Sequence, residues 1–142
     1  MKFSFEAKTT ITPEKIWDFY ADINKWFSWE DDLQSISLDG DFIAGSIGTM
    51  TLEGMPPMEF SLTEVIPNKL FTDKTIIKDV GELYFIHELD TIDGLTSVKH
   101  SVEFISKNND IDTIQDSQFV SKVFSDVPAS IFKLIEVAND SI

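Results

Sequence analysis

The sequence contains no cysteine and no arginine, and these two absences exclude several classes of site. Without cysteine, the chain has no disulfide bond and no thiolate that could act as a nucleophile or metal ligand. Without arginine, it lacks the side chain that holds phosphate or carboxylate through paired hydrogen bonds. Thiol catalysis, cysteine-based metal sites and arginine-based anion recognition are therefore excluded.

Positive charge is also scarce. The chain has 11 lysines against 25 acidic residues, which gives a formal net charge of −14 at pH 7. Nucleic acids and anionic membranes are bound by clustered basic residues, so neither is expected as a partner. No hydrophobic run is long enough to cross a membrane, and no basic region precedes an apolar stretch as in a secretion signal. We therefore expect a cytoplasmic protein without membrane insertion.

The length and the hydrophobic content indicate one folded domain over residues 1–142. The chain has 142 residues, of which 42% are hydrophobic and 12% aromatic. A chain of about 150 residues buries roughly 70% of the surface that it exposes when unfolded, so a core can form without cross-links. No repeat, linker or low-complexity segment divides the sequence.

The most informative segment begins at Thr12 and reads TPEKIWDFYADINKWFSWEDDL. Thr12 is a good N-cap residue and Pro13 suits the first helical position, so we expect a helix that runs to about Ile23. Trp26 and Trp29 follow on one face of a second short helical turn. Two neighbouring indole rings either fill a core or line a cavity.

Alternation of apolar and polar residues predicts strands along most of the chain. The predicted strands cover Lys2–Ile11, Gln34–Leu38, Thr49–Glu53, Met58–Ile66, Leu70–Ile77, Leu83–Ile92 and Leu95–Ile105. In the hairpin around residues 53–57 we expect Met50 to face Phe60, because that register keeps the apolar residues on one face.

The last hairpin is defined most sharply, because Asp93-Gly94 is a strong signal for a two-residue turn. This turn places His87 opposite His100, and these are the only two histidines in the sequence. On the other face Glu88 then lies opposite Lys99, which predicts a cross-strand ion pair. The histidine face is otherwise apolar, so we expect both imidazoles to point toward the covered side of the sheet.

A helical pattern extends from about Thr113 to Ala138, after a polar loop at residues 108–112. Its apolar residues recur at spacings of three and four, as in an amphipathic helix. Pro128 lies inside the pattern, so the helix either kinks there or breaks, with Asp126 capping a second helix. The unbroken apolar stripe favours a kink. This helix is the only large element that can cover one face of the sheet, which predicts an α+β architecture.

Several short motifs together cover nearly the whole chain. They are TPEKIWDFYADINKWFSW after the first strand, GSIGTM and LTEVIPNKL in the middle strands, DGLTSV in the last hairpin and VPASIFKLIEVA near the end. In this order they resemble the START-related helix-grip superfamily, also called SRPBCC or polyketide cyclase/dehydrase-like. The resemblance implies a curved antiparallel sheet of about seven strands wrapped around a long C-terminal helix, with two short helices after the first strand.

The same resemblance implies a cavity between the sheet and the C-terminal helix. Members of the superfamily bind lipids, sterols, polyketides or other apolar ligands. Some are cyclases or hydrolases, and some are interaction modules related to co-chaperones or toxins. They share no catalytic motif, so the fold alone does not supply a reaction.

Two interpretations of the histidine pair compete. His87 and His100 either act on a ligand, as general acid and base or as hydrogen-bond partners, or they are neutral structural residues. In the structural case they are bonded to each other, to a hydroxyl group or to water. We expect no metal, because the chain has no third histidine and no cysteine to complete a metal site.

We expect a ligand to be surrounded mainly by apolar side chains that the predicted elements bring to the covered face. The predicted lining residues are Trp26, Trp29, Met50, Phe60, Phe85, His87, His100, Val102, Phe124 and Val127. The acidic run Glu30, Asp31 and Asp32 is interpreted as solvated surface. The sequence carries no phosphate loop, dinucleotide fingerprint or nucleophile elbow.

These observations favour a protein that binds a small apolar or amphipathic molecule, without a cofactor, in a cavity between the sheet and the C-terminal helix. Two alternatives stay open. One is a cyclase- or dehydratase-like enzyme that uses the pocket histidines, and the other is an interaction module of the chaperone-activator type. The sequence leaves the ligand and the oligomeric state undetermined.

Overall fold

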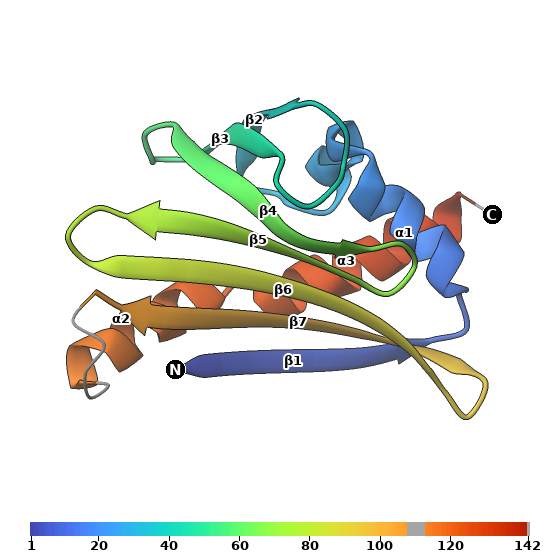
Figure 1. Ribbon diagram of the computed structural model, residues 1–142. Coiled ribbons are helices and arrows are strands. Elements are labelled where there is room, and N and C mark those ends of the chain that lie inside the picture. The colour runs from blue at the N-terminus through green and yellow to red at the C-terminus, as the bar shows by residue number, and fades with distance from the viewer. Residues whose placement is uncertain (108–112, 142) are drawn as a thin grey trace.

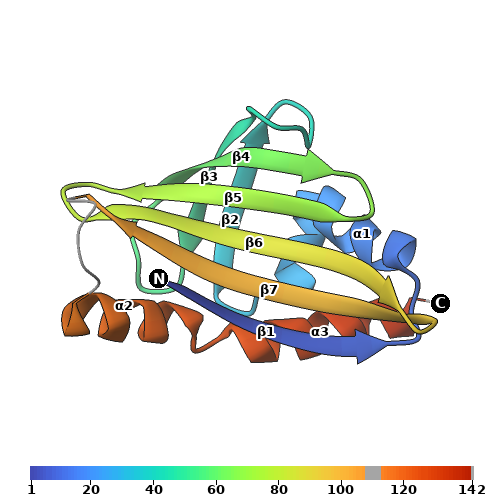
Figure 2. The same cartoon turned by 60° about the horizontal axis from the view of Figure 1, so that its bottom comes forward.

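The computed structural model describes residues 1–107 and 113–141, so the polar loop expected at residues 108–112 lies outside the described residues. Within them, seven strands form one antiparallel sheet in the order β1-β7-β6-β5-β4-β3-β2 (Figure 1). The strands are β1 (Lys2–Thr9), β2 (Leu33–Asp39), β3 (Ile47–Leu52), β4 (Met58–Ile66), β5 (Leu70–Ile77), β6 (Gly81–Ile92) and β7 (Leu95–Ser106). The sheet curves around the C-terminal helices, which run along its inner side (Figure 2).

Two short helical elements follow β1, as the sequence predicts. Helix α1 (Pro13–Ala21) and the 3-10 helix η1 (Ile23–Ser28) lie at one end of the sheet (Figure 1). The Thr12 hydroxyl accepts a hydrogen bond from the backbone N–H of Lys15, which confirms the predicted N-cap of α1. The buried side of α1 includes Ile16 and Tyr20, which face the core.

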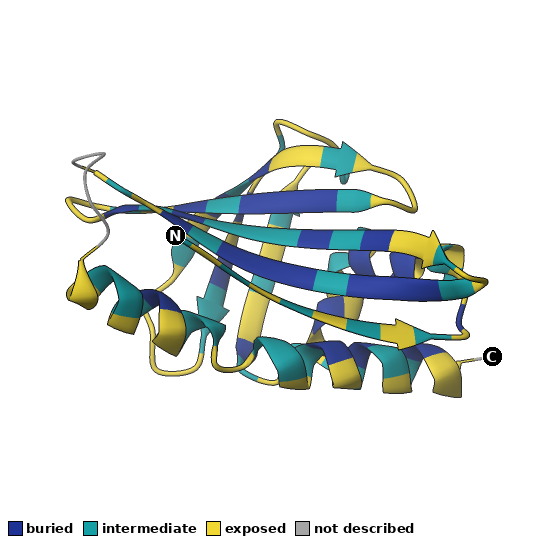
Figure 3. Cartoon of the chain, turned by 90° about the horizontal axis from the view of Figure 1, so that it is seen from below, coloured by how far each residue is buried: buried dark blue, intermediate teal, exposed yellow. Residues whose placement is uncertain are grey.

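The C-terminal helical segment is divided into α2 (Ile114–Phe124) and α3 (Val127–Asp140), separated by Ser125 and Asp126. Of the two alternatives that the sequence leaves open, the break is observed and the favoured kink is not. Pro128 has no N–H to donate to the carbonyl of Phe124, so the helical hydrogen bonding is interrupted there. Asp126 occupies the N-cap position of α3, but its side chain makes no capping hydrogen bond. The exposed residues of both helices lie on the side turned away from the sheet (Figure 3).

The hairpin of β3 and β4 has a different register from the predicted one. Met50 faces Met58 and Gly48 faces Phe60, a shift of two residues that keeps the same side chains on the inner face. A Cβ atom at Gly48 would lie 2.6 Å from the ring of Phe60, so the glycine makes room for this ring. The end of β3 pairs only with β2, and Leu52 faces Leu33 there. The connecting loop is consequently longer than a tight hairpin turn.

The hairpin of β6 and β7 confirms the predicted register. Asp93 and Gly94 both have positive φ angles, of 53° and 79°, as a two-residue hairpin turn requires. His87 faces His100, and Glu88 faces Lys99. The predicted ion pair is nevertheless absent among the described residues, and Oε2 of Glu88 is buried without a hydrogen-bond partner.

The core divides into two clusters on the inner side of the sheet. The larger one lies toward α1 and η1 and contains large aromatic side chains such as Tyr20, Trp29 and Phe71. The smaller one comprises Leu83, Val102, Phe104 and Val120, between β6, β7 and α2. The candidate site borders both clusters.

Candidate functional site

A cavity of about 410 Å³ lies between the inner face of the sheet and the C-terminal helices. Most of its wall is apolar and consists of Met50, Leu52, Met55, Met58, Ile77, Leu83, Phe85, Val102, Phe119, Val123 and Val127. The polar lining residues are Glu30, Asp32, Thr75, His87, His100, Ser101, Lys122, Asp126 and Ser130. The cavity therefore has a mostly apolar wall with a limited set of polar groups, as small-molecule binding pockets usually do.

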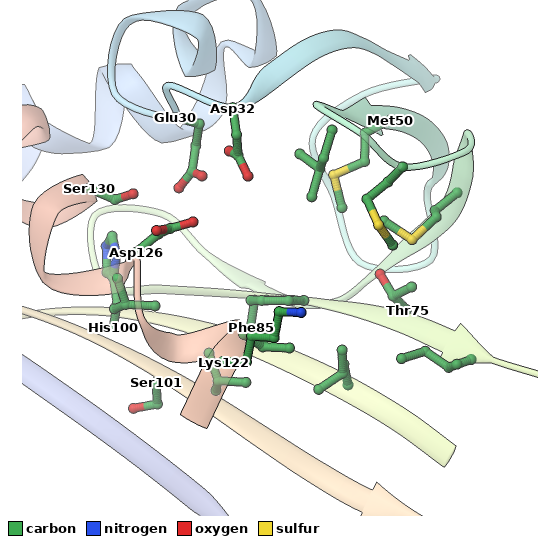
Figure 4. A pocket seen from close by; sticks show the side chains of 18 of the residues that line it. Glu30, Asp32, Met50, Thr75, Phe85, His100, Ser101, Lys122, Asp126 and Ser130 are labelled. Carbon is green, nitrogen blue, oxygen red and sulfur yellow. The ribbon is translucent and has the colours of Figure 1, made fainter. Parts of the chain in front are cut away.

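The polar and apolar groups are separated within the cavity. Figure 4 shows the carboxyl groups of Glu30, Asp32 and Asp126 gathered on one side, whereas Met50 lies on the opposite side. The hydroxyl oxygen of Thr75 is buried without a hydrogen-bond partner and also belongs to the wall. Because the walls are apolar at one side and acidic at the other, the cavity is itself amphipathic.

The two histidines lie side by side in the cavity wall, with ring centroids 4.6 Å apart. The Nε2 atom of His100 and the hydroxyl of Tyr20 form a hydrogen bond of 2.6 Å. The Nδ1 atom of His87 lies 3.3 Å from the carbonyl oxygen of Phe71, and because a carbonyl only accepts, Nδ1 carries the proton. The ring of His87 also stacks on that of Phe71, with centroids 3.9 Å apart. Both imidazoles therefore have partners within the protein.

Burial keeps both imidazoles neutral. It lowers the pKa of His87 from 6.5 to about 3, although the hydrogen bond to the Phe71 carbonyl acts in the opposite direction. Burial, together with the neighbouring His87, holds the pKa of His100 well below its usual range. Burial also raises the pKa of the Tyr20 hydroxyl. At neutral pH this group is an uncharged hydrogen-bonded network, which is poorly suited to general acid and base catalysis.

The two tryptophans of the 3-10 turn are buried, with 5% of Trp26 and 1% of Trp29 exposed. Both indole N–H groups are bound by the end of α1: that of Trp26 donates to the carbonyl of Tyr20 and that of Trp29 to the carbonyl of Phe19. The rings line a small recess of about 80 Å³ that shares residues such as Glu30 with the main cavity. The two rings therefore pack in the core and also form part of a cavity wall.

The structure brings most of the predicted lining residues together. The main cavity is lined by Met50, Phe85, His87, His100, Val102 and Val127, and the recess by Trp26 and Trp29. Two predicted residues lie outside both spaces. Phe60 is buried against Trp26, with ring centroids 6.2 Å apart, because the β3–β4 register places it over Gly48. Phe124 packs on Phe3 at 5.8 Å, because it ends α2 on the side of β1.

Sequence reasoning missed the acidic groups of the site. Glu30 and Asp32 lie in the cavity wall, so their interpretation as solvated surface is wrong, and only Asp31 is fully exposed. Asp73 is buried and lines the recess. Its position in β5 carries a signal, because alternation from the buried Phe71 places Asp73 on the same face.

Burial has a strong effect on two of these carboxyl groups. It raises the pKa of Asp73 from 3.8 to about 8. It also raises the pKa of Glu30 from 4.5 to about 8, with further contributions from the carboxyls of Asp32 and Asp73, while a hydrogen bond with Ser130 opposes the rise. Both groups are therefore largely protonated at pH 7 in the empty cavity.

The described residues contain no cluster of three or more histidine, aspartate or glutamate side chains placed to hold a metal ion. In the same part of the chain, no helix has the length and apolar character that a membrane-crossing segment needs.

Comparison with solved structures gives similarity over almost the entire chain. The crystal structure of Ara h 8.0201 has a TM-score of 0.74 and 14% sequence identity, covering 99% of this chain and 98% of the other. Protein MLL2253 from Mesorhizobium loti has a TM-score of 0.78 and 12% identity, with coverage of 100% and 99%. Norcoclaurine synthase from Thalictrum flavum has a TM-score of 0.70 and 14% identity, with coverage of 96% and 85%.

The sequence matches no family model and no curated protein. At identities this low, the similarity to solved structures establishes the architecture and leaves the activity open. The seven-stranded curved sheet, the two short helical elements after β1 and the C-terminal helices agree with the expected arrangement. The chain therefore has the helix-grip fold of the START-related proteins.

Proposed function

We propose that the protein binds a small apolar or amphipathic molecule in the cavity between the sheet and helices α2 and α3. The observation that carries this proposal is the volume of about 410 Å³ behind a mostly apolar wall. Pockets for small organic ligands have volumes of roughly 300–1,000 Å³ and similar walls with few polar groups. A ligand that binds the folded protein and not the unfolded chain also stabilises the fold.

The apolar part of the ligand would lie against Met50, Met55 and Met58. Methionine side chains are flexible and polarisable, so they adapt to ligands of different shape. The polar part would lie toward the side where the carboxyl groups of Glu30 and Asp126 gather (Figure 4). This division favours an amphipathic ligand over a purely apolar one.

The two alternative functions have less support. An enzyme that uses the histidines needs one of them to change protonation near neutral pH, whereas burial lowers the pKa of both His87 and His100. An interaction module of the chaperone-activator type needs an exposed apolar patch rather than a deep cavity. The cavity thus favours binding over the interaction module, and the lowered pKa values of the histidines favour binding over the enzyme.

The test is binding of Nile red, a neutral apolar dye, followed by fluorescence. We expect the wild-type protein to bind it and Val123→Trp, which places an indole in the cavity wall, to lose at least about tenfold in affinity. Ile76→Trp is the matched control, because Ile76 is 67% exposed and does not line the cavity. Equal binding by the two variants, or no binding by the wild type, would contradict the proposal. Native mass spectrometry of protein purified from its own host would then identify the natural ligand.

A further inference from the structure

The recess beside the tryptophans has an unusual composition for a buried space. Its volume is about 80 Å³, and its wall includes Trp26, Trp29, Glu30, Asp73 and His87. Two carboxyl groups thus share one small space with two indole rings. We call this space the acidic recess.

Asp73 has no partner in the fold. The residue is only 3% exposed, and among the described residues its carboxyl group forms no hydrogen bond and no ion pair. A buried carboxyl group without a partner is destabilising by several kcal/mol in general, so such groups are rare in native proteins. Because Asp73 lines the recess, water or a bound group in that space is its available partner.

The neighbouring donors are already in use. The indole N–H groups of Trp26 and Trp29 donate to carbonyl groups of α1. His87 donates its Nδ1 proton to the Phe71 carbonyl, so in the neutral ring Nε2 is an acceptor. Among the described side chains, the only donors left in the acidic recess are therefore the protonated carboxyls of Glu30 and Asp73, and once these ionise the recess presents only acceptors and aromatic faces.

The charge of the adjoining main cavity also favours a cationic group over an anionic one. Glu30 belongs to both spaces, and Asp32 and Asp126 line the main cavity next to it. Against these carboxyls, Lys122 is the one lysine in the cavity wall, and it forms no ion pair among the described residues. An anionic head group would meet a surplus of like charge here.

We propose that the acidic recess receives the ammonium group of an amphipathic amine whose apolar part occupies the main cavity. An ammonium group supplies several N–H donors and one positive charge, and these match the ionised carboxyls of the recess, which then have no donor of their own. The faces of Trp26 and Trp29 add a favourable environment for a cation. This inference rests on the proposed function, and it specifies the chemical class of the ligand.

The size of the recess limits the head group. A space of about 80 Å³ holds a few atoms, because a single water needs roughly 10–15 Å³ by this measure. An unsubstituted or singly substituted ammonium group fits, whereas a bulky head group does not. A metal ion is a poorer occupant, since no metal-binding cluster is formed by the described residues.

The test compares three ligands with the same eight-carbon chain: octylamine, octanol and octanoate. Calorimetry at about pH 8, near the raised pKa of both carboxyls, should give at least about tenfold tighter binding for octylamine than for octanol, and the weakest binding for octanoate. Asp73→Asn should reduce the octylamine affinity about tenfold and leave the octanol affinity unchanged. Glu30→Gln should also reduce the octylamine affinity. It provides a second variant if Asp73→Asn folds poorly.

Asp31→Asn is the matched control, because Asp31 is exposed and belongs to the same acidic run as Glu30. Equal affinities for octylamine and octanol, or an Asp73→Asn variant that binds octylamine like the wild type, would overturn the inference while the proposed function stands. Displacement of octylamine by millimolar calcium would also overturn it, because the recess would then be a metal site. If none of the three ligands binds, the proposed function fails as well.

Discussion

Two pairs of titratable side chains line the main cavity and the acidic recess, and they differ in their hydrogen bonds to the rest of the protein. His87 and His100 are bonded to the Phe71 carbonyl and the Tyr20 hydroxyl. Glu30 has only Ser130 as a hydrogen-bond partner, and Asp73 has none among the described residues. Glu30 and His87 line both the main cavity and the recess, whereas His100 lines only the main cavity and Asp73 only the recess.

The difference indicates which pair belongs to the scaffold and which to the ligand. A buried polar group is stable when its hydrogen bonds are complete, and it is destabilising when they are not. Each histidine has one ring nitrogen bonded to another group of the protein, so the pair is held as part of the fold. Asp73 has no such bond among the described residues, and Glu30 has only Ser130, so the carboxyls are the better candidates for contact with a bound molecule. The sequence leaves both interpretations of the histidines open, because it does not reveal their hydrogen-bond partners.

The largest expected effect concerns stability and pH. The pKa values of Asp73 and Glu30 are raised to about 8 in the folded protein. Between about pH 4 and pH 8 the folded protein therefore holds protons that the unfolded chain has lost, and the free energy of unfolding falls as pH rises. At about 1.4 kcal/mol per pKa unit, the decline should reach at least about 2 kcal/mol.

Urea denaturation at a series of pH values measures this decline. Asp73→Asn removes one of the two groups, so its unfolding free energy should depend less steeply on pH than that of the wild type. Asp31→Asn should leave the slope as it is. An identical slope in the Asp73→Asn variant would show that this carboxyl is not a buried, protonated group.

The next effect concerns the partner of His100. Tyr20→Phe removes the hydroxyl group and leaves a buried imidazole nitrogen without its hydrogen bond. We expect a loss of about 1–3 kcal/mol in the free energy of unfolding. Tyr84→Phe is the comparison, since the Tyr84 hydroxyl bonds to Glu82 at a partly exposed site and should contribute about 0.5 kcal/mol or less. Equal losses of unfolding free energy in the two variants would show that the buried hydrogen bond contributes no more to stability than the partly exposed one.

A further prediction concerns the pH dependence of amine binding. The carboxyls of Glu30 and Asp73 ionise as pH rises through about 8, whereas an alkylamine stays protonated, so the octylamine affinity should increase about tenfold from about pH 6 to pH 8.5. The other polar or charged groups that line the two spaces are Asp32 before β2, Thr75 on β5, His87 on β6, His100 and Ser101 on β7, Lys122 on α2, Asp126 between α2 and α3, and Ser130 on α3. Calorimetry corrected for buffer protonation should also detect proton release at pH 7. Affinity that is constant over this range would count against ionisation of the recess.

The smallest effect is expected at the histidines themselves. Because burial lowers the pKa of His87 to about 3 and that of His100 below its usual range, their imidazole NMR signals should not shift between about pH 5 and pH 8. A titration midpoint near pH 6.5 would reopen the possibility of acid and base catalysis. Replacement of both by glutamine should then be tested for loss of turnover.

The elements with strong local signals were predictable from the sequence. Thr12 and Pro13 mark the start of α1, and Asp93-Gly94 sets the register that pairs His87 with His100. These signals depend on residues that are close together in the sequence, and the folded structure agrees with them. The β3–β4 register was missed because it depends on the fit of Phe60 over Gly48, a contact that alternation of apolar residues does not reveal.

The candidate site was predictable only in its apolar part. Strand alternation places Phe85 and Val102 on the inner face, where the structure has them in the cavity wall. The acidic part was missed because carboxylates are usually solvated, and a short run such as Glu30 to Asp32 does not tell which members turn inward. Asp73 was detectable from its position in β5, because it occupies an inward site next to residues of the core.

The separation of α2 from α3 has a consequence for how this protein can change over generations. Ile131, Leu134 and Ala138 of α3 are fully buried and anchor the fold, whereas Phe119 and Val123 of α2 are only partly buried and line the cavity. The break at Ser125 and Asp126 separates these two groups of residues, although Val120 of α2 is also fully buried and Val127 at the start of α3 also lines the cavity. Substitutions at Phe119 and Val123 can therefore reshape the cavity and alter ligand preference without touching the buried residues of α3.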